Sequence, residues 1–216
     1  MQLRGSKLRD QGLTLIEVVV VIFSLFILAA TLLATVSAPR IRNSVGCVNQ
    51  LKQAGLAANV REGNYHSQPA VIFTATNGVA WESGAAGTAE ALFQGMSNEL
   101  VSTKLLVCPA DMMRLPAASF HSLKPDNLSY FINLNHRESN PQTFLMGDDN
   151  LEVRGARVKA GVLDVTANAP LSWSAERHRF YGNIALSDGS VQGINNLALR
   201  ETLRGTNFPP LRLAIP

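Results

Sequence analysis

The pattern of apolar and polar positions divides the chain into an apolar run, an amphipathic segment and a mixed remainder. Between Leu13 and Val36 most positions are apolar, and none is glycine or proline. A run of about twenty such residues is long enough for a helix that crosses a bilayer. Beyond Pro39, which can kink a helix without ending it, apolar residues recur at helical spacing until Gly63-Asn64, a good C-terminal stop. The pattern predicts one long N-terminal helix with an apolar half and an amphipathic half.

From Tyr65 onward, short apolar runs alternate with clusters of turn residues, which is typical of short strands. The expected strands are 70–76, 104–109, 128–134, 143–147 and a hairpin at 181–194, with short helices at 88–96 and 196–203. In the hairpin, Asp188-Gly189 suits a tight type I′ turn. The closing segment 208–216 is expected to be extended and packed on the domain. One helix followed by many strands predicts an α+β domain with an antiparallel sheet packed on that helix.

The charge distribution argues against a nucleic-acid surface. The formal net charge is +3, and Arg4, Lys7, Arg9 and Asp10 place +2 of it before the apolar run. The rest of the chain is nearly neutral and has no basic stripe interleaved with aromatic residues. Basic residues ahead of an apolar helix predict an N-terminus on the cytoplasmic side of a membrane.

The chain lacks the sequence patterns of common enzymes. It contains no GxSxG, no HExxH and no glycine-rich phosphate loop. Asp148 and Asp149 could be taken for a carboxylate pair, but adjacent strand residues point to opposite faces. His178, Ser187 and Asp188 could be arranged into a triad, yet a turn aspartate explains Asp188 more simply. We therefore expect no catalytic activity.

Three interpretations compete for the N-terminal segment. A secretory signal peptide would be cut near Val36-Ser37-Ala38, but the apolar run is longer than usual for such peptides. A plain single-pass anchor explains the length but neither Gly12 nor Glu17. The stretch Gly12-Leu13-Thr14-Leu15-Ile16-Glu17, after a basic leader, resembles the prepilin cleavage and methylation motif of type IV pilins and type II secretion pseudopilins. Leu13 departs from the phenylalanine that is commonest there.

The resemblance gives each residue of the motif a role. It implies that a prepilin peptidase cuts between Gly12 and Leu13 and N-methylates the new terminus at Leu13. A carboxylate among hydrocarbon is costly, about 2.5–3.5 kcal/mol. Glu17 would be tolerated because the new amino group of Leu13 on a neighbouring subunit pairs with it and sets the register of assembly. Apolar positions such as Val18 and Val21 would pack in the filament core.

A second resemblance covers most of the chain. His178 precedes Asp188-Gly189 by the spacing of the prepilin-associated H-X9-DG domain. Several earlier helix and strand segments of the chain also resemble segments of that domain and occur in the same order as they do there. It implies a pilin-like α+β fold. The expected parts are a leader at 1–12, a transmembrane half-helix at 13–38, an amphipathic half-helix at 39–63 and a β-rich domain at 64–216. For His178, Asp188 and Gly189 we expect structural roles in the sheet and its turn.

The expected function is that of a prepilin-type filament subunit, a pseudopilin or type IV pilin-like protein, in a pilus or secretion pseudopilus. The implied partners are the prepilin peptidase, other pilin subunits, an inner-membrane assembly platform and membrane lipid. The implied location is the inner membrane, crossed once, with the globular domain periplasmic or extracellular. The alternatives are an uncleaved, membrane-anchored periplasmic binding domain and a minor subunit that primes or caps a filament.

The cysteines and acidic residues leave two further questions open. Cys47 and Cys108 are either buried small side chains or one disulfide, since the chain has no other cysteine and no CxxC motif. We expect no cofactor. The major pseudopilin of type II secretion has a calcium site in its C-terminal loops, and Asp148, Asp149 and Asp188 are the acidic loop residues here. Calcium needs six to eight oxygen ligands, and the sequence does not supply that set.

Overall fold

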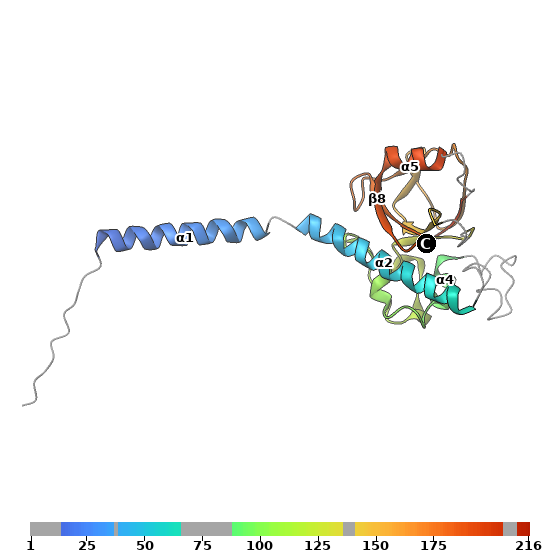
Figure 1. Ribbon diagram of the computed structural model, residues 1–216, viewed down its shortest axis with the longest axis horizontal. Helices are drawn as coiled ribbons and strands as arrows, with labels where there is room; N and C mark the ends of the chain where they lie inside the picture. The colour runs from blue at the N-terminus through green and yellow to red at the C-terminus, as the bar shows by residue number, and fades with distance from the viewer. Residues whose placement is uncertain (1–13, 37–38, 66–87, 136–140, 205–210) are drawn as a thin grey trace, which may run out of the picture. The chain divides into compact units, whose positions relative to one another are not determined.

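The computed structural model describes residues 14–36, 39–65, 88–135, 141–204 and 211–216. The chain divides into two units, 1–39 and 40–216, which are described separately. The α-helices are α1 (Leu15–Val36), α2 (Pro39–Tyr65), α4 (Ala89–Gly95) and α5 (Asn196–Arg204) (Figure 1). The short 3-10 helices are η2 (Thr103–Leu106), η3 (Phe120–Ser122) and η4 (Pro125–Asn127).

Two antiparallel sheets form the second unit. The strands are β1 (Tyr130–Asn133), β2 (Phe144–Asp148), β3 (Leu151–Val153), β4 (Ala156–Arg157), β5 (Gly161–Val165), β6 (Leu171–Trp173), β7 (Tyr181–Leu186), β8 (Val191–Asn195) and β9 (Leu211–Ile215). The larger sheet has the order β5-β9-β1-β2-β7-β8, and the smaller has the order β4-β3-β6. All their pairings are antiparallel. The expected α+β class with an antiparallel sheet is therefore confirmed.

Side chains of the central strands alternate between two cores. In β1, Tyr130 and Ile132 belong to the first core and Phe131 to the second. In β7, Ala185 lies in the first core and Ile184 in the second. A period of two is what a pleated strand imposes when both of its faces are covered. The first core lies against α2 and α4, and the second lies against the smaller sheet and α5.

Helix α2 packs against the larger sheet mostly through small residues. Its buried face is formed by Cys47, Leu51, Ala54, Ala57 and Ala58, all part of the first core. At Gly55 the helix comes close to the sheet, because a Cβ there would lie 3.4 Å from the Cβ of Ala185. The turn after β7 is tied to the same helix by a 3.1 Å hydrogen bond from Asn59 Nδ2 to the carbonyl of Ser187.

The membrane-spanning part of the sequence prediction is wrong. In the described part of the chain, no helix combines the length and the apolar character needed to cross a membrane. This finding overturns the transmembrane half-helix at 13–38 and the single-pass inner-membrane location. α1 ends at Val36 and α2 begins at Pro39, and residues 37–38 between them lie outside the described residues.

Some of the expected strands are present in the structure and one is not. The expected strands at 128–134 and 143–147 correspond to β1 and β2, and the hairpin at 181–194 corresponds to β7 and β8. The segment 104–109 is not a strand, because Ser102 caps η2 there by accepting from the backbone N–H of Lys104. The described part of the C-terminal segment is extended, as expected, and forms β9 between β5 and β1 in the larger sheet. The expected strand at 70–76 lies outside the described residues.

Candidate functional site

The N-terminus of α1 is built around Glu17. Thr14 precedes the first helical residue, and its backbone N–H donates to Glu17 Oε2 at 2.7 Å. The Thr14 hydroxyl donates to the same oxygen at 2.8 Å. The backbone hydrogen bond and then the hydroxyl lower the pKa of the Glu17 carboxyl. A carboxylate at this position also interacts favourably with the positive end of the helix dipole, so Glu17 stabilises the first turn as an ionised group.

This capping role was missed from sequence although its signal was present. A Ser or Thr followed three residues later by Glu, just before an apolar run, is the pattern of a capping box. Thr14 and Glu17 fit that pattern. Gly12 and Leu13, the expected cleavage pair, lie outside the described residues.

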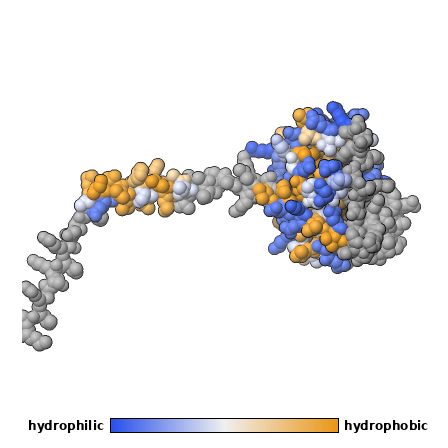
Figure 2. Space-filling model, viewed as in Figure 1, coloured by the Kyte–Doolittle hydropathy of each residue, from blue (hydrophilic) through white to orange (hydrophobic). Residues whose placement is uncertain are grey.

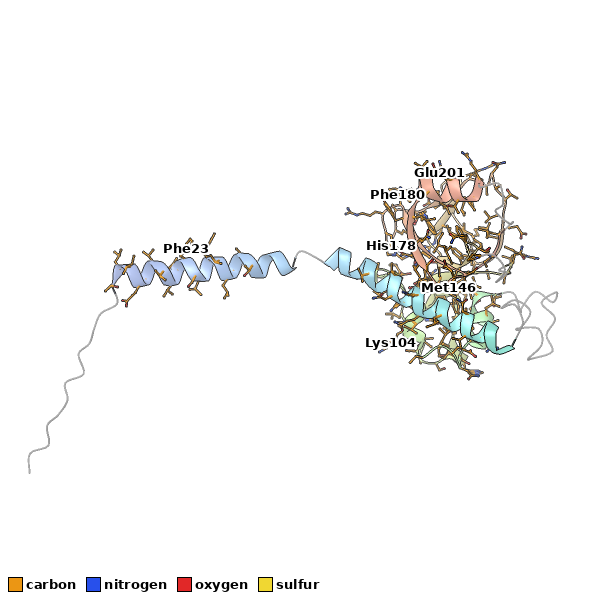
Figure 3. All side chains as sticks on the ribbon, viewed as in Figure 1. Phe23, Lys104, Met146, His178, Phe180 and Glu201 are labelled. Carbon is orange, nitrogen blue, oxygen red and sulfur yellow. A yellow bond between two sulfur atoms is a disulfide. The ribbon has the colours of Figure 1, made fainter. Side chains whose placement is uncertain are left out.

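The surface of α1 is apolar on all sides. Every described side chain of this helix is exposed, and Figure 2 shows hydrophobic colouring along most of its described length. Figure 3 shows Phe23 extending from the helix, with 65% of its surface exposed. Within α1, the hydroxyls of Ser24 and Thr31 donate to the carbonyls of the residues three positions earlier, so these donors are satisfied inside the helix. Such a helix offers one kind of contact, the burial of apolar surface.

In the second unit, the most concentrated chemistry is a buried ionic cluster centred on Asp149. Its Oδ2 accepts from Arg114 at 2.5 Å, and its Oδ1 accepts from Arg177. Asp111 Oδ2 lies 3.4 Å from Arg177 Nη1 and 3.7 Å from Arg114 Nη1. Burial opposes the charge of Arg177, but Asp149, Asp148 and Asp111 outweigh it and raise the pKa of the guanidinium. The cluster joins the loop that follows η2, the end of β2 and the loop before β7.

Asp148, the last residue of β2, occupies a second buried position beside this cluster. Its Oδ2 accepts from the backbone N–H of Asn183 at 2.7 Å and from Asn183 Nδ2 at 2.8 Å. His178 Nε2 lies 3.5 Å from the same oxygen. Burial raises the pKa of the Asp148 carboxyl, while Arg177, His178 and Asn183 act in the opposite direction. The ionised form therefore depends on these neighbours.

The loop that carries Arg177 and His178 has an unusual backbone. Arg177, Arg179 and Phe180 all have positive φ, between 53° and 65°, a conformation that non-glycine residues rarely adopt. Asn150 fixes both ends of the loop, since its Nδ2 donates to the carbonyls of Glu176 and Tyr181. Figure 3 labels His178 and Phe180 in this loop. Positive φ persists where surrounding contacts fix it, and here the contacts are those of Asn150 and Asp149.

Cys47 of α2 and Cys108, which follows η2, are joined in a disulfide with Cα atoms 4.9 Å apart. Both sulfurs are buried in the first core. His178 Nε2 lies 3.4 Å from Cys108 Sγ. The bond ties the helix to the middle of the domain, and the loop before β7 reaches the same point through its histidine. Sequence reasoning named all three residues but gave no reason to place the histidine beside the sulfur.

The H-X9-DG residues lie at the two ends of β7. His178 precedes the strand and Asp188-Gly189 follows it, so the spacing is the length of β7 with its flanking residues. His178 reaches Asp148 and Cys108 rather than the turn. The turn is not type I′, because only Gly189 has positive φ, with its N–H bonded to the carbonyl of Leu186 at 3.0 Å. Such a turn with a glycine bulge is another common hairpin connection.

The three acidic residues considered for calcium do not come together. Asp148 lies opposite Asn183 and Asp149 lies between two guanidinium groups. Asp188 is exposed at the far end of β7, five residues beyond Asn183, which corresponds to about 17 Å of strand. Its carboxyl accepts from Ser190, which lowers its pKa. These residues do not fit a shared calcium site.

Comparisons of the chain with protein-family models, with curated proteins and with solved structures found no match. Two features of the chain itself bear on function: an exposed apolar helix that begins with a capped carboxylate, and a disulfide-linked domain with a buried ionic cluster.

Proposed function

We propose that this chain is a subunit of a prepilin-type filament. A prepilin peptidase cleaves it between Gly12 and Leu13, and copies then associate through α1. The observation that carries the proposal is the exposed apolar surface of α1 around its whole circumference. Fully burying one Leu, Ile, Val or Phe side chain contributes about 1.5–3 kcal/mol. A helix with this composition gains most by packing against other helices of the same kind.

Glu17 gives that association a register. Apolar contact alone is non-directional and does not select one axial offset between helices. A single carboxylate at the start of an apolar helix pairs best with one positive group, and cleavage after Gly12 would create an amine four residues before it. Val18, Val21, Leu25 and Leu28 are all exposed on α1 and available for the helix contacts. The proposal therefore combines one electrostatic contact, which sets position, with many apolar contacts, which supply affinity.

Two substitutions at Glu17 test this role against simple helix capping. Glu17→Gln keeps an oxygen that can accept from the Thr14 N–H but removes the charge. Glu17→Ala removes both. If the charge pairs with a neighbouring amine, both variants should be cleaved but should lose assembly, measured as the fraction of processed chain recovered in sedimented polymer.

Glu90 in the first turn of α4 offers a matched control. Glu90→Gln removes an acid from a helix start in the globular unit and should assemble like the unmodified chain. If Glu17→Gln assembled normally while Glu17→Ala did not, the carboxylate would be a cap only. That result would contradict the electrostatic part of the proposal.

A further inference from the structure

Three metal-ligating side chains from separate parts of the domain meet at one buried point. The sulfurs of Cys47 and Cys108 and a ring nitrogen of His178 all lie within 4.8 Å of one another. In the structure the two sulfurs are bonded to each other. We propose that reduction of this disulfide creates a zinc site, in which both thiolates and His178 Nε2 bind one Zn²⁺. The inference is independent of filament assembly.

Two of the distances between donor atoms already match those of a tetrahedral zinc centre. With Zn–S near 2.3 Å and Zn–N near 2.0–2.1 Å, a tetrahedral centre separates S and N by about 3.5 Å and N and O by about 3.3 Å. Here Cys108 Sγ lies 3.4 Å from His178 Nε2, and Asp148 Oδ2 lies 3.5 Å from the same nitrogen. Once the S–S bond is broken, rotation of the Cys47 side chain can open the sulfur pair to the roughly 3.8 Å that two thiolates on zinc require.

Asp148 lies outside this trio but contacts its histidine, and in the proposed site it supplies the fourth ligand. Its side chain is fully buried, and its Oδ1 has no hydrogen-bond partner among the described residues. Oδ2, the oxygen nearer His178, is the proposed ligand atom. A buried carboxylate whose other oxygen lacks a donor is costly, and a cation bound to this carboxylate offsets that cost. Asn183 holds the other oxygen next to His178 through two hydrogen bonds. The aspartate is thus fixed at the end of β2, beside the histidine that completes the trio.

The chemistry balances with an external thiol or phosphine as reductant. Two electrons from the reductant break the S–S bond, and each cysteine sulfur takes up a proton. A dithiol reductant is oxidised to its disulfide, whereas a phosphine is oxidised to its oxide. Binding of Zn²⁺ then displaces both thiol protons to solvent and leaves two thiolates on the metal. In the oxidised protein the sulfurs are not thiolates, so the site exists only in the reduced state.

The two states would hold the fold together differently. The disulfide links α2 to the segment after η2, whereas zinc would also link both to the loop before β7 through His178 and to β2 through Asp148. The three cysteine and histidine side chains are almost fully buried. The full chain should therefore be reduced with a phosphine in mild denaturant and returned to buffer without oxygen before metal is added.

The test measures binding of Zn²⁺ alone and of Co²⁺ alone to the reduced and oxidised full chain. We expect the reduced protein to bind one equivalent of Zn²⁺, and the oxidised protein to have no site of comparable affinity. Co²⁺ should give a thiolate-to-metal charge-transfer band only after reduction. His178→Ala and Asp148→Asn should each weaken Zn²⁺ binding by about tenfold or more.

His121, an exposed histidine of η3, provides the control. His121→Ala should bind Zn²⁺ as the unmodified chain does. Circular dichroism follows folding in parallel, because a reduced chain that refolds only when Zn²⁺ is added would also support the site. The proposal is overturned if the reduced chain binds no more Zn²⁺ than the oxidised chain, or if His178→Ala binds it as tightly as His121→Ala.

Discussion

Asp149→Asn should lower the free energy of unfolding of the globular unit by about 3–5 kcal/mol, the usual cost of breaking a buried ion pair from one side. Asparagine has nearly the same shape, so the change removes charge rather than volume. Arg114 and Arg177 would then lose the carboxylate that each contacts most closely. Asp111 lies further from both guanidinium groups and already accepts from Ser129. Urea unfolding of the oxidised protein measures the loss.

Asp164 provides a matched control for this experiment. It pairs with Arg212 at 3.6 Å, but its side chain is 75% exposed. Exposed pairs of this kind contribute about 0–1 kcal/mol, so Asp164→Asn should unfold at nearly the same urea concentration as the unmodified chain. If the two asparagine variants were equally stable, the cluster around Asp149 would not stabilise the fold, and the loop before β7 would be held by other contacts.

Loss of the disulfide should have a comparable effect. The bond closes a loop between residues 61 positions apart, and the chain-entropy model then gives about 4 kcal/mol. A Cys47→Ala, Cys108→Ala double variant should therefore be less stable by about that amount in urea. Part of this loss acts through the unfolded chain, which is no longer cross-linked, so the dependence of stability on urea should also become steeper.

The comparison needs a metal chelator throughout, because a reduced chain could otherwise be stabilised by zinc. Under those conditions, reduced unmodified protein should behave like the double variant. A loss below about 1 kcal/mol in both would contradict the view that this bond is a main support of the domain.

Local patterns predicted the elements that are continuous apolar runs or that carry a clear turn or helical stripe. β1 and β2 are short runs that are buried throughout, and Asp188-Gly189 marks the turn of the β7–β8 hairpin. α5 has a helical stripe in which Leu199 and Leu203 are buried. The strands β3 to β6 were missed because they are short or largely exposed, so they leave little pattern to detect. The strand predicted at 104–109 was wrong because a short apolar run fits a strand or a buried turn equally well. The Ser102 cap favours the 3-10 turn η2 there.

The candidate site was less predictable because its partners are far apart in sequence. Arg114, Asp149 and Arg177 come from three loops, and nothing in their spacing indicates that they meet. The Thr14 and Glu17 cap could have been found, since its pattern is local. The membrane-crossing prediction is wrong, because no helix in the described part of the chain combines the length and the apolar character that a span requires. A pattern of apolar residues records only that a surface avoids water, and does not say what covers it.

The central claim is that this chain becomes a filament subunit once its leader has been removed. Mass spectrometry of the N-terminal peptide, taken from protein isolated from its native source, tests this most directly. The account predicts a chain that begins at Leu13 and carries a methylated amino group. A chain that still begins at Met1 would contradict it, because no new amine would then exist to pair with Glu17 of a neighbouring copy.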